Sequence, residues 1–196
     1  MSRSLLALDV ATTTGWAFGP VEADARPSTS GHIRFGREGA PDAEVWKRAL
    51  IWLTEQLNVL QPTVVAIEAP INSASPEGGS NAHTLGRLIG LQAVLRTVVE
   101  IKLPVTAKLI HVQSARKFFI SHGNLPGKEA KKQVQRRCLD LGWLDEDGLQ
   151  PDRADAMCVW AKAVADICPE FAAGMTPLGA RRSNVVNLIP KSEVAF

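Results

Sequence analysis

The stretch Leu5-Leu6-Ala7-Leu8-Asp9-Val10 decides the fold. Four consecutive apolar residues followed by an acid predict a buried strand, central in a sheet, that carries a carboxylate where it ends. A buried carboxylate is costly unless it is protonated, paired with a base or bound to a cation. No Lys, Arg or His lies between Ser4 and Val10, so the partner of Asp9 must come from another segment. Taken alone, Asp9 is also compatible with an ordinary acid at a strand end.

The chain repeats this design at Thr63-Val64-Val65-Ala66-Ile67-Glu68, where a run rich in β-branched residues again ends in a carboxylate. A helical pattern over 42–60 precedes this strand, so we expect the strand to lie parallel to the first one and next to it. Asp9 and Glu68 would then be neighbours. Two adjacent carboxylates repel each other unless a cation lies between them, and their oxygens suit Mg²⁺ or Mn²⁺.

The composition predicts a globular protein. The 196 residues are 45% hydrophobic and carry a formal charge of +2, which suits one domain over 1–172 followed by a tail over 173–196. The three cysteines show no Cys-x-x-Cys spacing, which argues against a disulfide framework or a zinc site. No stretch approaches the roughly 20 apolar residues of a membrane span, and no signal peptide is visible. We therefore expect a cytoplasmic protein without a membrane partner.

The remaining pattern predicts an α/β fold with a mixed five-stranded sheet. Strands over 15–19 and 31–36 follow the first strand as antiparallel neighbours, and a further buried strand is expected over 105–112. Helical periods cover 83–100, 113–121 and 128–141, and a last helix begins at 152. Residues 72–81 are rich in Pro, Gly and Ser and predict a loop beside the two acids.

The helix over 83–100 has an unusually broad apolar face. Leu88, Leu91 and Leu95 span a wide arc, so we expect that they cannot all face the sheet and that part of this face forms a homodimer contact. Core packing is the alternative. Gly86 and Gly90 lie four residues apart and would allow another element to approach closely in either case.

Basic residues concentrate between Arg116 and Arg137, where the one acid is Glu129. Such a run opposite an acidic site suits the phosphates of a nucleic acid, although a solvated helix face is the alternative. The candidate DNA-binding residues are Arg116, Lys117, Lys128, Lys131, Lys132 and Arg136.

Two more acids open the last helix. Asp152 and Asp155 are three residues apart, so their side chains share one face of its first turn. N-terminal capping and complementation of the helix dipole are the alternative, but a single Asp would satisfy both. Asp155 stands among Ala154, Ala156 and Met157, which makes it a candidate for a partly buried acid that faces the sheet.

In this order and spacing, the motifs resemble the RNase H-like superfamily and, within it, the RuvC-like Holliday junction resolvases. The resemblance implies an RNase H-like fold, in which the first three strands are antiparallel, the later ones are parallel, and helices flank the sheet. No single motif is specific, but together they are fairly specific. The resemblance runs from Leu5 to about Ala165 and rests on Leu8-Asp9 with Thr14-Gly15-Trp16-Ala17, Ala66-Ile67-Glu68, Ser114-Ala115-Arg116-Lys117, Ala130-Lys131-Lys132-Gln133-Val134-Gln135 and Asp152-Arg153-Ala154-Asp155-Ala156.

The resemblance also implies a chemistry. Asp9, Glu68, Asp152 and Asp155 match the four metal-binding acids of the family, and Lys131 matches a basic residue beside its active site. Two Mg²⁺ or Mn²⁺ ions held by these acids would activate water for an in-line attack on phosphorus. The implied protein is a metal-dependent endodeoxyribonuclease that works as a homodimer. It would resolve four-way or other branched DNA by paired, symmetric nicks that leave 5′-phosphates.

One residue departs from the family pattern, and other functions stay open. Bacterial members carry an aromatic residue three positions after the second acid, where this chain has Ile71, and the short, divergent loop suggests a phage or prophage member. An RNA-processing nuclease of the YqgF type and a non-catalytic branched-DNA-binding protein are the alternatives. Actin-like ATPases begin with a similar strand, acid and hairpin, but they need two such domains and 196 residues hold one. No nucleotide cofactor is therefore expected.

Overall fold

The computed structural model describes residues 3–70 and 82–175, and the strands in this part of the chain form one sheet in the order β3-β2-β1-β4-β5. β2 lies antiparallel to β1 and β3, whereas β4 lies parallel to β1 and β5. The expected α/β fold with a mixed five-stranded sheet is confirmed. The strands are β1 (Ser4–Asp9), β2 (Thr13–Pro20), β3 (Thr29–Arg34), β4 (Val64–Glu68) and β5 (Lys108–Ile110).

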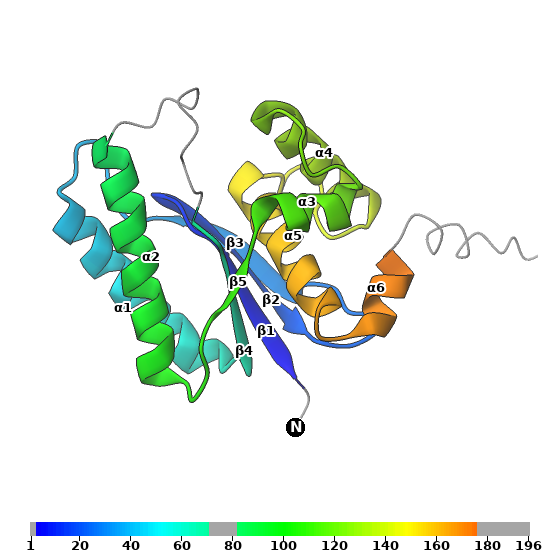
Figure 1. Cartoon of the computed structure of the whole chain (residues 1–196), viewed down its shortest axis with the longest axis horizontal. Helices are drawn as coiled ribbons and strands as arrows, with labels where there is room; N and C mark the ends of the chain where they lie inside the picture. The colour runs from blue at the N-terminus through cyan, green and yellow to red at the C-terminus, as the bar shows by residue number, and fades with distance from the viewer. Residues whose placement is uncertain (1–2, 71–81, 176–196) are drawn as a thin grey trace, which may run out of the picture.

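Helices cover both faces of this sheet (Figure 1). α1 (Asp42–Leu60) and α2 (Ala82–Lys102) pack together on one face. α5 (Pro151–Ala165) crosses the other face over β1 and β2. Three further helices lie on the α5 side, and they are α3 (Val112–Ile120), α4 (Gly127–Asp140) and α6 (Pro169–Met175).

The side chains of β1 alternate between two hydrophobic cores. Leu6 and Leu8 pack into the core beneath α1 and α2, whereas Leu5 and Ala7 pack into the core beneath α5. A strand turns successive side chains to opposite faces, so the residue after Leu8 points to the α5 side. The alternation that builds both cores thereby directs Asp9 towards α5.

Element boundaries differ from the prediction where the local pattern is weak. β5 spans three residues instead of 105–112, and one of them, Ile110, is fully buried. β2 begins at Thr13, so the turn after β1 is shorter than expected, and the Thr14 hydroxyl donates to the carbonyl oxygen of Ala11 at 2.7 Å. α6 was not expected and continues to Met175, past the predicted start of the tail at 173.

The packing of α2 corrects the expectation for its apolar face. Leu91 and Leu95 are fully buried in the hydrophobic core of the chain and Leu88 is half-buried, so Leu91 and Leu95 do not offer an apolar surface to a second subunit. The apolar arc is broad because α2 packs on α1 as well as over the sheet. A Cβ at Gly90 would lie 2.2 Å from the ring of Trp46 on α1, so the glycine lets the two helices close together.

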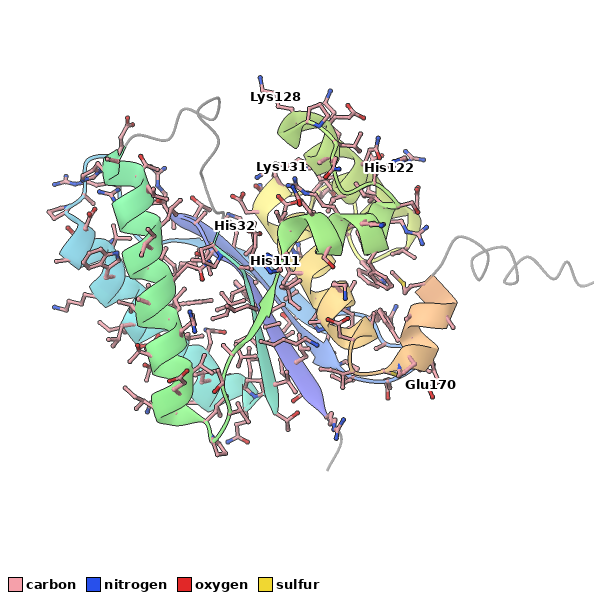
Figure 2. All side chains as sticks on the ribbon, in the orientation of Figure 1. His32, His111, His122, Lys128, Lys131 and Glu170 are labelled. Atoms are coloured by element: carbon pink, nitrogen blue, oxygen red, sulfur yellow. The ribbon has the colours of Figure 1, made fainter. Side chains whose placement is uncertain are left out.

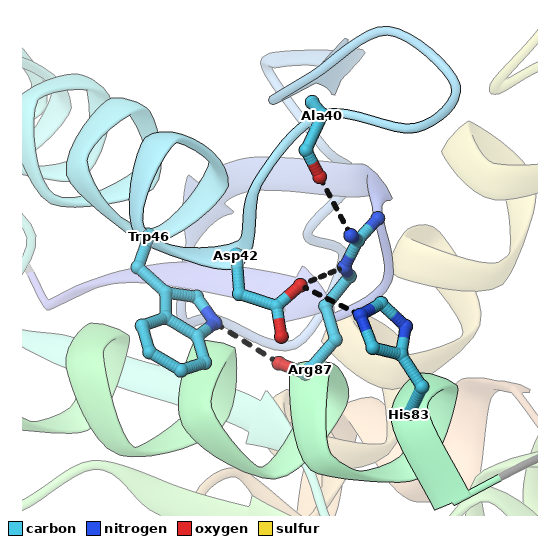
Figure 3. Close-up of polar contacts among 5 residues, drawn as sticks. All are labelled: Ala40, Asp42, Trp46, His83 and Arg87. Carbon is cyan, nitrogen blue, oxygen red and sulfur yellow. Dashed lines mark hydrogen bonds and ion pairs between the residues drawn. The ribbon is translucent and has the colours of Figure 1, made fainter.

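A polar cluster fixes the N-terminal ends of α1 and α2 relative to each other (Figure 3). Arg87 donates from Nε to the Asp42 carboxylate at 2.6 Å and from Nη2 to the carbonyl oxygen of Ala40 at 2.7 Å. The same carboxylate lies 3.8 Å from His83, and Trp46 Nε1 donates to the carbonyl oxygen of Arg87 at 3.1 Å. These contacts set the position of α2 along α1.

Some predicted features lie outside the described residues. These are Ile71, the loop over 72–81, and the predicted tail from residue 176 onwards. Across residues 3–70 and 82–175, no helix is long and apolar enough to cross a membrane.

Candidate active site

Asp9 and Glu68 meet where two neighbouring strands end. The parallel register pairs Leu8 with Ile67, so Asp9 and Glu68 follow side by side. Ala66 packs on the α5 side, and the alternation of β4 therefore sends Glu68 to the same face as Asp9. Burial raises the pKa of Asp9 well above its ordinary value, and the hydrogen bond and negative charge of Glu68 raise it further. The predicted pairing of the two strand-end acids is confirmed.

Gly15 brings α5 onto the sheet beside these acids. It pairs with Asp9 across the β1–β2 hairpin. A Cβ at this position would lie 1.8 Å from the backbone oxygen of Asp152 and 3.2 Å from the Cβ of Ala156. Because no other residue type leaves this space, the glycine lets the first turn of α5 approach the C-terminal end of β1. Asp152 and Asp155 reach the site through this contact.

Arg153 holds the same turn of α5 from another side. Its Nε donates to the Ser30 hydroxyl on β3 at 2.7 Å, and its Nη1 donates to the carbonyl oxygen of Gly148 at 3.2 Å. The residue that precedes α5 is Gln150, and its side chain makes no capping hydrogen bond. Asp152 lies in the first turn of α5, so the alternative that it complements the helix dipole stays open.

Lys131 of α4 bridges the two acids of α5. Its Nζ lies 3.3 Å from a carboxylate oxygen of Asp152 and 3.3 Å from one of Asp155. Burial alone would lower the pKa of Lys131, but the charges of Asp155 and Asp152 outweigh burial and raise this pKa. The pKa of Asp155 is raised to about 6, first by burial and then by the charge of Asp9, while Lys131 and Arg116 oppose the shift. Burial and the neighbouring acid Asp9 thus outweigh the two cations and favour the neutral form of the Asp155 carboxyl.

The four carboxylates have the chemistry of a divalent-cation site without being arranged as one. Among the residues that the structure describes, no group of three or more His, Cys, Asp or Glu side chains is placed to hold a metal ion. The contacts show why, because Asp9 is hydrogen-bonded to Glu68 and Lys131 engages Asp152 and Asp155. The donor set nevertheless fits Mg²⁺ or Mn²⁺, since a bound cation would stabilise the charged carboxylates of Asp9 and Asp155, whose pKa values are raised in its absence.

The basic residues predicted to bind DNA fall into two groups. Arg116 and Lys131 face the acids, and the buried Nε of Arg116 has no hydrogen-bond partner among the described residues. Figure 2 shows Lys131 beside the N-terminal end of α5 and Lys128 at the outer end of α4. The exposed group on α3 and α4 consists of Lys117, Lys128, Lys132 and Arg136.

A groove of about 600 Å³ adjoins the exposed group. Its hydroxyl, amide, imidazole and ammonium groups suit hydrogen bonds to phosphate oxygens. Arg136, outside the groove, pairs with Asp140 at 3.0 Å, which partly neutralises its charge. The groove is lined by Gln113, Ser114, Lys117, Ser121, His122, Gly123, Asn124 and Leu125.

Sequence reasoning missed Gln92 of α2. This residue is 8% exposed, and its Nε2 donates to the backbone oxygen of Glu68 at 2.7 Å. A signal was present, because a glutamine interrupts the apolar face that contains Leu91 and Leu95. The motifs also include Gly15 and Arg153, but their contacts with α5 and β3 depend on tertiary packing that residue spacing does not predict.

The comparisons with known proteins rest on structure. No protein-family model matches the chain, and no curated protein matches it by sequence. Thermus thermophilus RuvC matches with a TM-score of 0.64 at 16% identity, over 84% of this chain and 95% of the RuvC chain. RuvC of the same organism in complex with a Holliday junction substrate has a TM-score of 0.65 at 14% identity, with the same coverage.

A third solved structure extends the likeness beyond bacteria. The yeast mitochondrial Holliday junction resolvase Ydc2 matches with a TM-score of 0.59 at 11% identity, over 94% of this chain and 85% of Ydc2. The resemblance of this chain to RuvC-like resolvases is confirmed at the level of the RNase H-like fold.

Proposed function

We propose that this chain is a metal-dependent, structure-selective endodeoxyribonuclease that resolves four-way or other branched DNA. Paired symmetric nicks would leave 5′-phosphates, and the reaction would take place in the cytoplasm. The observation that carries the proposal is the convergence of Asp9, Glu68, Asp152 and Asp155 with Lys131 at one end of the sheet. The similarity to a RuvC structure that holds a Holliday junction supports the choice of substrate.

The four acids and the basic side chain of Lys131 would have different roles in this reaction. Asp9, Glu68, Asp152 and Asp155 would hold two Mg²⁺ or Mn²⁺ ions, which supply an activated water and stabilise the leaving 3′ oxygen when bound. Lys131 must release Asp152 and Asp155 for these carboxylates to act as ligands. The ammonium group of Lys131 is then free to meet the negative charge of a phosphate.

The exposed lysines of α3 and α4 would hold the DNA backbone next to this site. Lys117, Lys128 and Lys132 lie on the same side of the sheet as α5, and the groove beside Lys117 offers further hydrogen-bond donors. Contacts of this kind position a duplex without reading its sequence. We therefore expect selection by branched structure, with the basic surface supplying affinity.

We also infer that the active unit is a homodimer. Resolution of a four-way junction requires two nicks placed symmetrically in strands of like polarity, whereas the described residues of one chain form one such cluster of acids. A two-fold dimer would present two such clusters to a two-fold substrate.

Incubation with a labelled four-way junction, a linear duplex and an RNA hairpin, with and without Mg²⁺, tests the proposal. The junction should be cut only with Mg²⁺ and in preference to the other substrates. Asp9→Asn should abolish cleavage while junction binding persists, because it removes a ligand charge and leaves the basic surface intact. The matched control is Asp24→Asn, which makes the same change at an exposed acid that is not one of the four candidate ligands, and this variant should cut like the wild type.

Other outcomes would favour the alternatives. Preferential cleavage of the RNA hairpin would point to an RNA-processing nuclease of the YqgF type. Junction binding by a wild-type protein that cuts no substrate with Mg²⁺ or Mn²⁺ would point to a non-catalytic branched-DNA-binding protein. Near wild-type cleavage by Asp9→Asn would show that the active site is misassigned.

A further inference from the structure

The peptide group between Glu68 and Ala69 is held from two sides. On one side, the Ala69 N–H donates to the carbonyl oxygen of Ile110 on β5 at 2.8 Å. On the other, the Glu68 carbonyl oxygen accepts a hydrogen bond from Gln92 Nε2 at 2.7 Å. Glu68 is the last residue of β4, where the regular pairing with β1 has already ended at Ile67. The side chain of α2 therefore fixes the backbone at the point where this acid leaves the sheet.

Burying the polar side chain of Gln92 costs folding stability, and an apolar residue at this position would avoid that cost. Gln92 is 8% exposed and stands in the buried face of α2 between Leu91 and Leu95. Its Oε1 is buried and has no hydrogen-bond partner among the described residues. An unsatisfied polar atom in such surroundings destabilises a fold, so packing alone does not account for a glutamine at this position.

Contacts with α1 and with the loop before it hold α2 in a fixed position, so Gln92 can restrain the backbone of Glu68. Arg87 ties the helix to Asp42 and to the backbone of Ala40 one to two turns before Gln92 (Figure 3). The close contact of Gly90 with Trp46 fixes the adjacent turn. The amide of Gln92 thus comes from an element whose position is set by contacts that do not involve the acids.

We propose that Gln92 is a positioning residue that orients Glu68 for divalent-cation binding by holding the Glu68 carbonyl group. The inference rests on the proposed function, because it assumes that Glu68 is a metal ligand. Residues that orient metal ligands through a hydrogen bond commonly change metal affinity by about 10- to 100-fold when they are replaced. Gln92 makes its contact through the backbone of the ligand residue, so we expect the lower end of this range.

The decisive variant is Gln92→Met, which keeps the length of the side chain and removes both its donor and its unsatisfied oxygen. Mn²⁺ binding to the full-length protein, alone and with a four-way junction, can be followed by the loss of the free-ion signal in electron paramagnetic resonance. Gln92→Met should bind Mn²⁺ about tenfold more weakly. Its affinity for the junction in EDTA and its thermal unfolding midpoint should stay close to those of the wild type.

Val98→Ala is the matched control on the same helix. It removes buried apolar contacts two turns further along α2, away from Glu68. This variant should lower the thermal unfolding midpoint by several degrees and leave Mn²⁺ binding unchanged. A merely structural role for Gln92 would produce the same pattern as Val98→Ala, with lower stability and unaltered ion binding.

The outcomes separate this inference from the proposed function. Equal Mn²⁺ affinity of Gln92→Met and the wild type would overturn the role of Gln92, and so would an equal loss of affinity in Val98→Ala. If the wild type binds Mn²⁺ but cuts no branched DNA, the proposed function fails while the comparison of Mn²⁺ affinities still decides the inference. A wild type that binds no Mn²⁺ even with the junction would overturn both.

Discussion

The surroundings of Asp155 oppose the ionisation of its carboxyl group. Its side chain is 10% exposed, and burial followed by the charge of Asp9 raises its pKa to about 6. In an unfolded chain an aspartate has a pKa near 3.9, so the folded protein holds this proton more tightly than the unfolded chain does. The contribution of Asp155 to the free energy of unfolding is therefore largest below about pH 4 and is lost as the pH rises to about 6.

This titration predicts a pH-dependent effect of Asp155→Asn in the metal-free protein. The difference of about two pKa units corresponds to about 3 kcal/mol, so the stability advantage of the variant over the wild type should grow by roughly that amount between pH 4 and pH 7. Urea unfolding in EDTA across this range measures it. A constant difference between Asp155→Asn and the wild type across this range would contradict the raised pKa of Asp155.

At the scale of residues, the sequence predicted the acids better than their partners. Asp9 and Glu68 were found because each ends an apolar strand, and strand order follows from connectivity. Lys131 was identified by its motif, but its bridge between Asp152 and Asp155 depends on where α4 packs. Local patterns carry no information about such long-range distances, and the predicted metal centre stays a prediction for the same reason.

Among the elements, α5 contributes most to the site, and its approach to the sheet depends on Gly15. A methyl group there would overlap the backbone of Asp152, which cannot move without the whole first turn. Gly15→Ala should therefore displace α5, lower the free energy of unfolding by about 3 kcal/mol or more, and abolish cleavage. Denaturant unfolding and the junction assay measure the two effects.

Gly86→Ala supplies the control for this prediction. Gly86 also lacks a side chain, but in contrast to Gly15, a Cβ at Gly86 would meet no described atom within 4 Å. Because the residue lies in α2, alanine should stabilise the protein by up to about 1 kcal/mol and leave cleavage intact. A Gly15→Ala variant as stable as the wild type would show that α5 does not need this close approach.

Element types were predicted well and element packing less so. The apolar run over 105–112 suggested a long buried strand, but Val105 and Leu109 are partly exposed and three residues form β5 at the edge of the sheet. An apolar run does not reveal how much of it a neighbouring strand covers. For α2, the broad apolar face predicted a subunit contact, whereas α1 covers part of this face and its Trp46 packs against Gly90.

At the scale of the whole molecule, we expect the proposed homodimer to form through the layer of α1 and α2. Large hydrophobic side chains are exposed on both helices, and on α2 Ile89 is 55% exposed between the half-buried Leu88 and the buried Leu91. A two-fold interface needs an apolar patch that remains after the core is complete. The others exposed on these helices are Leu50, Ile51, Val59 and Ile101.

Light scattering at micromolar concentration should therefore report about twice the chain mass. Ile89→Glu should shift the protein towards a folded monomer, because it places a charge in the apolar contact without entering the core. Leu91→Glu is unsuitable for this purpose, since Leu91 is fully buried and a charge there would unfold the chain. The monomeric variant should nick a four-way junction in one strand at a time instead of making paired cuts, because residues 3–70 and 82–175 of each chain provide one candidate site. Paired symmetric nicks by a monomer would refute both the interface and the need for two sites.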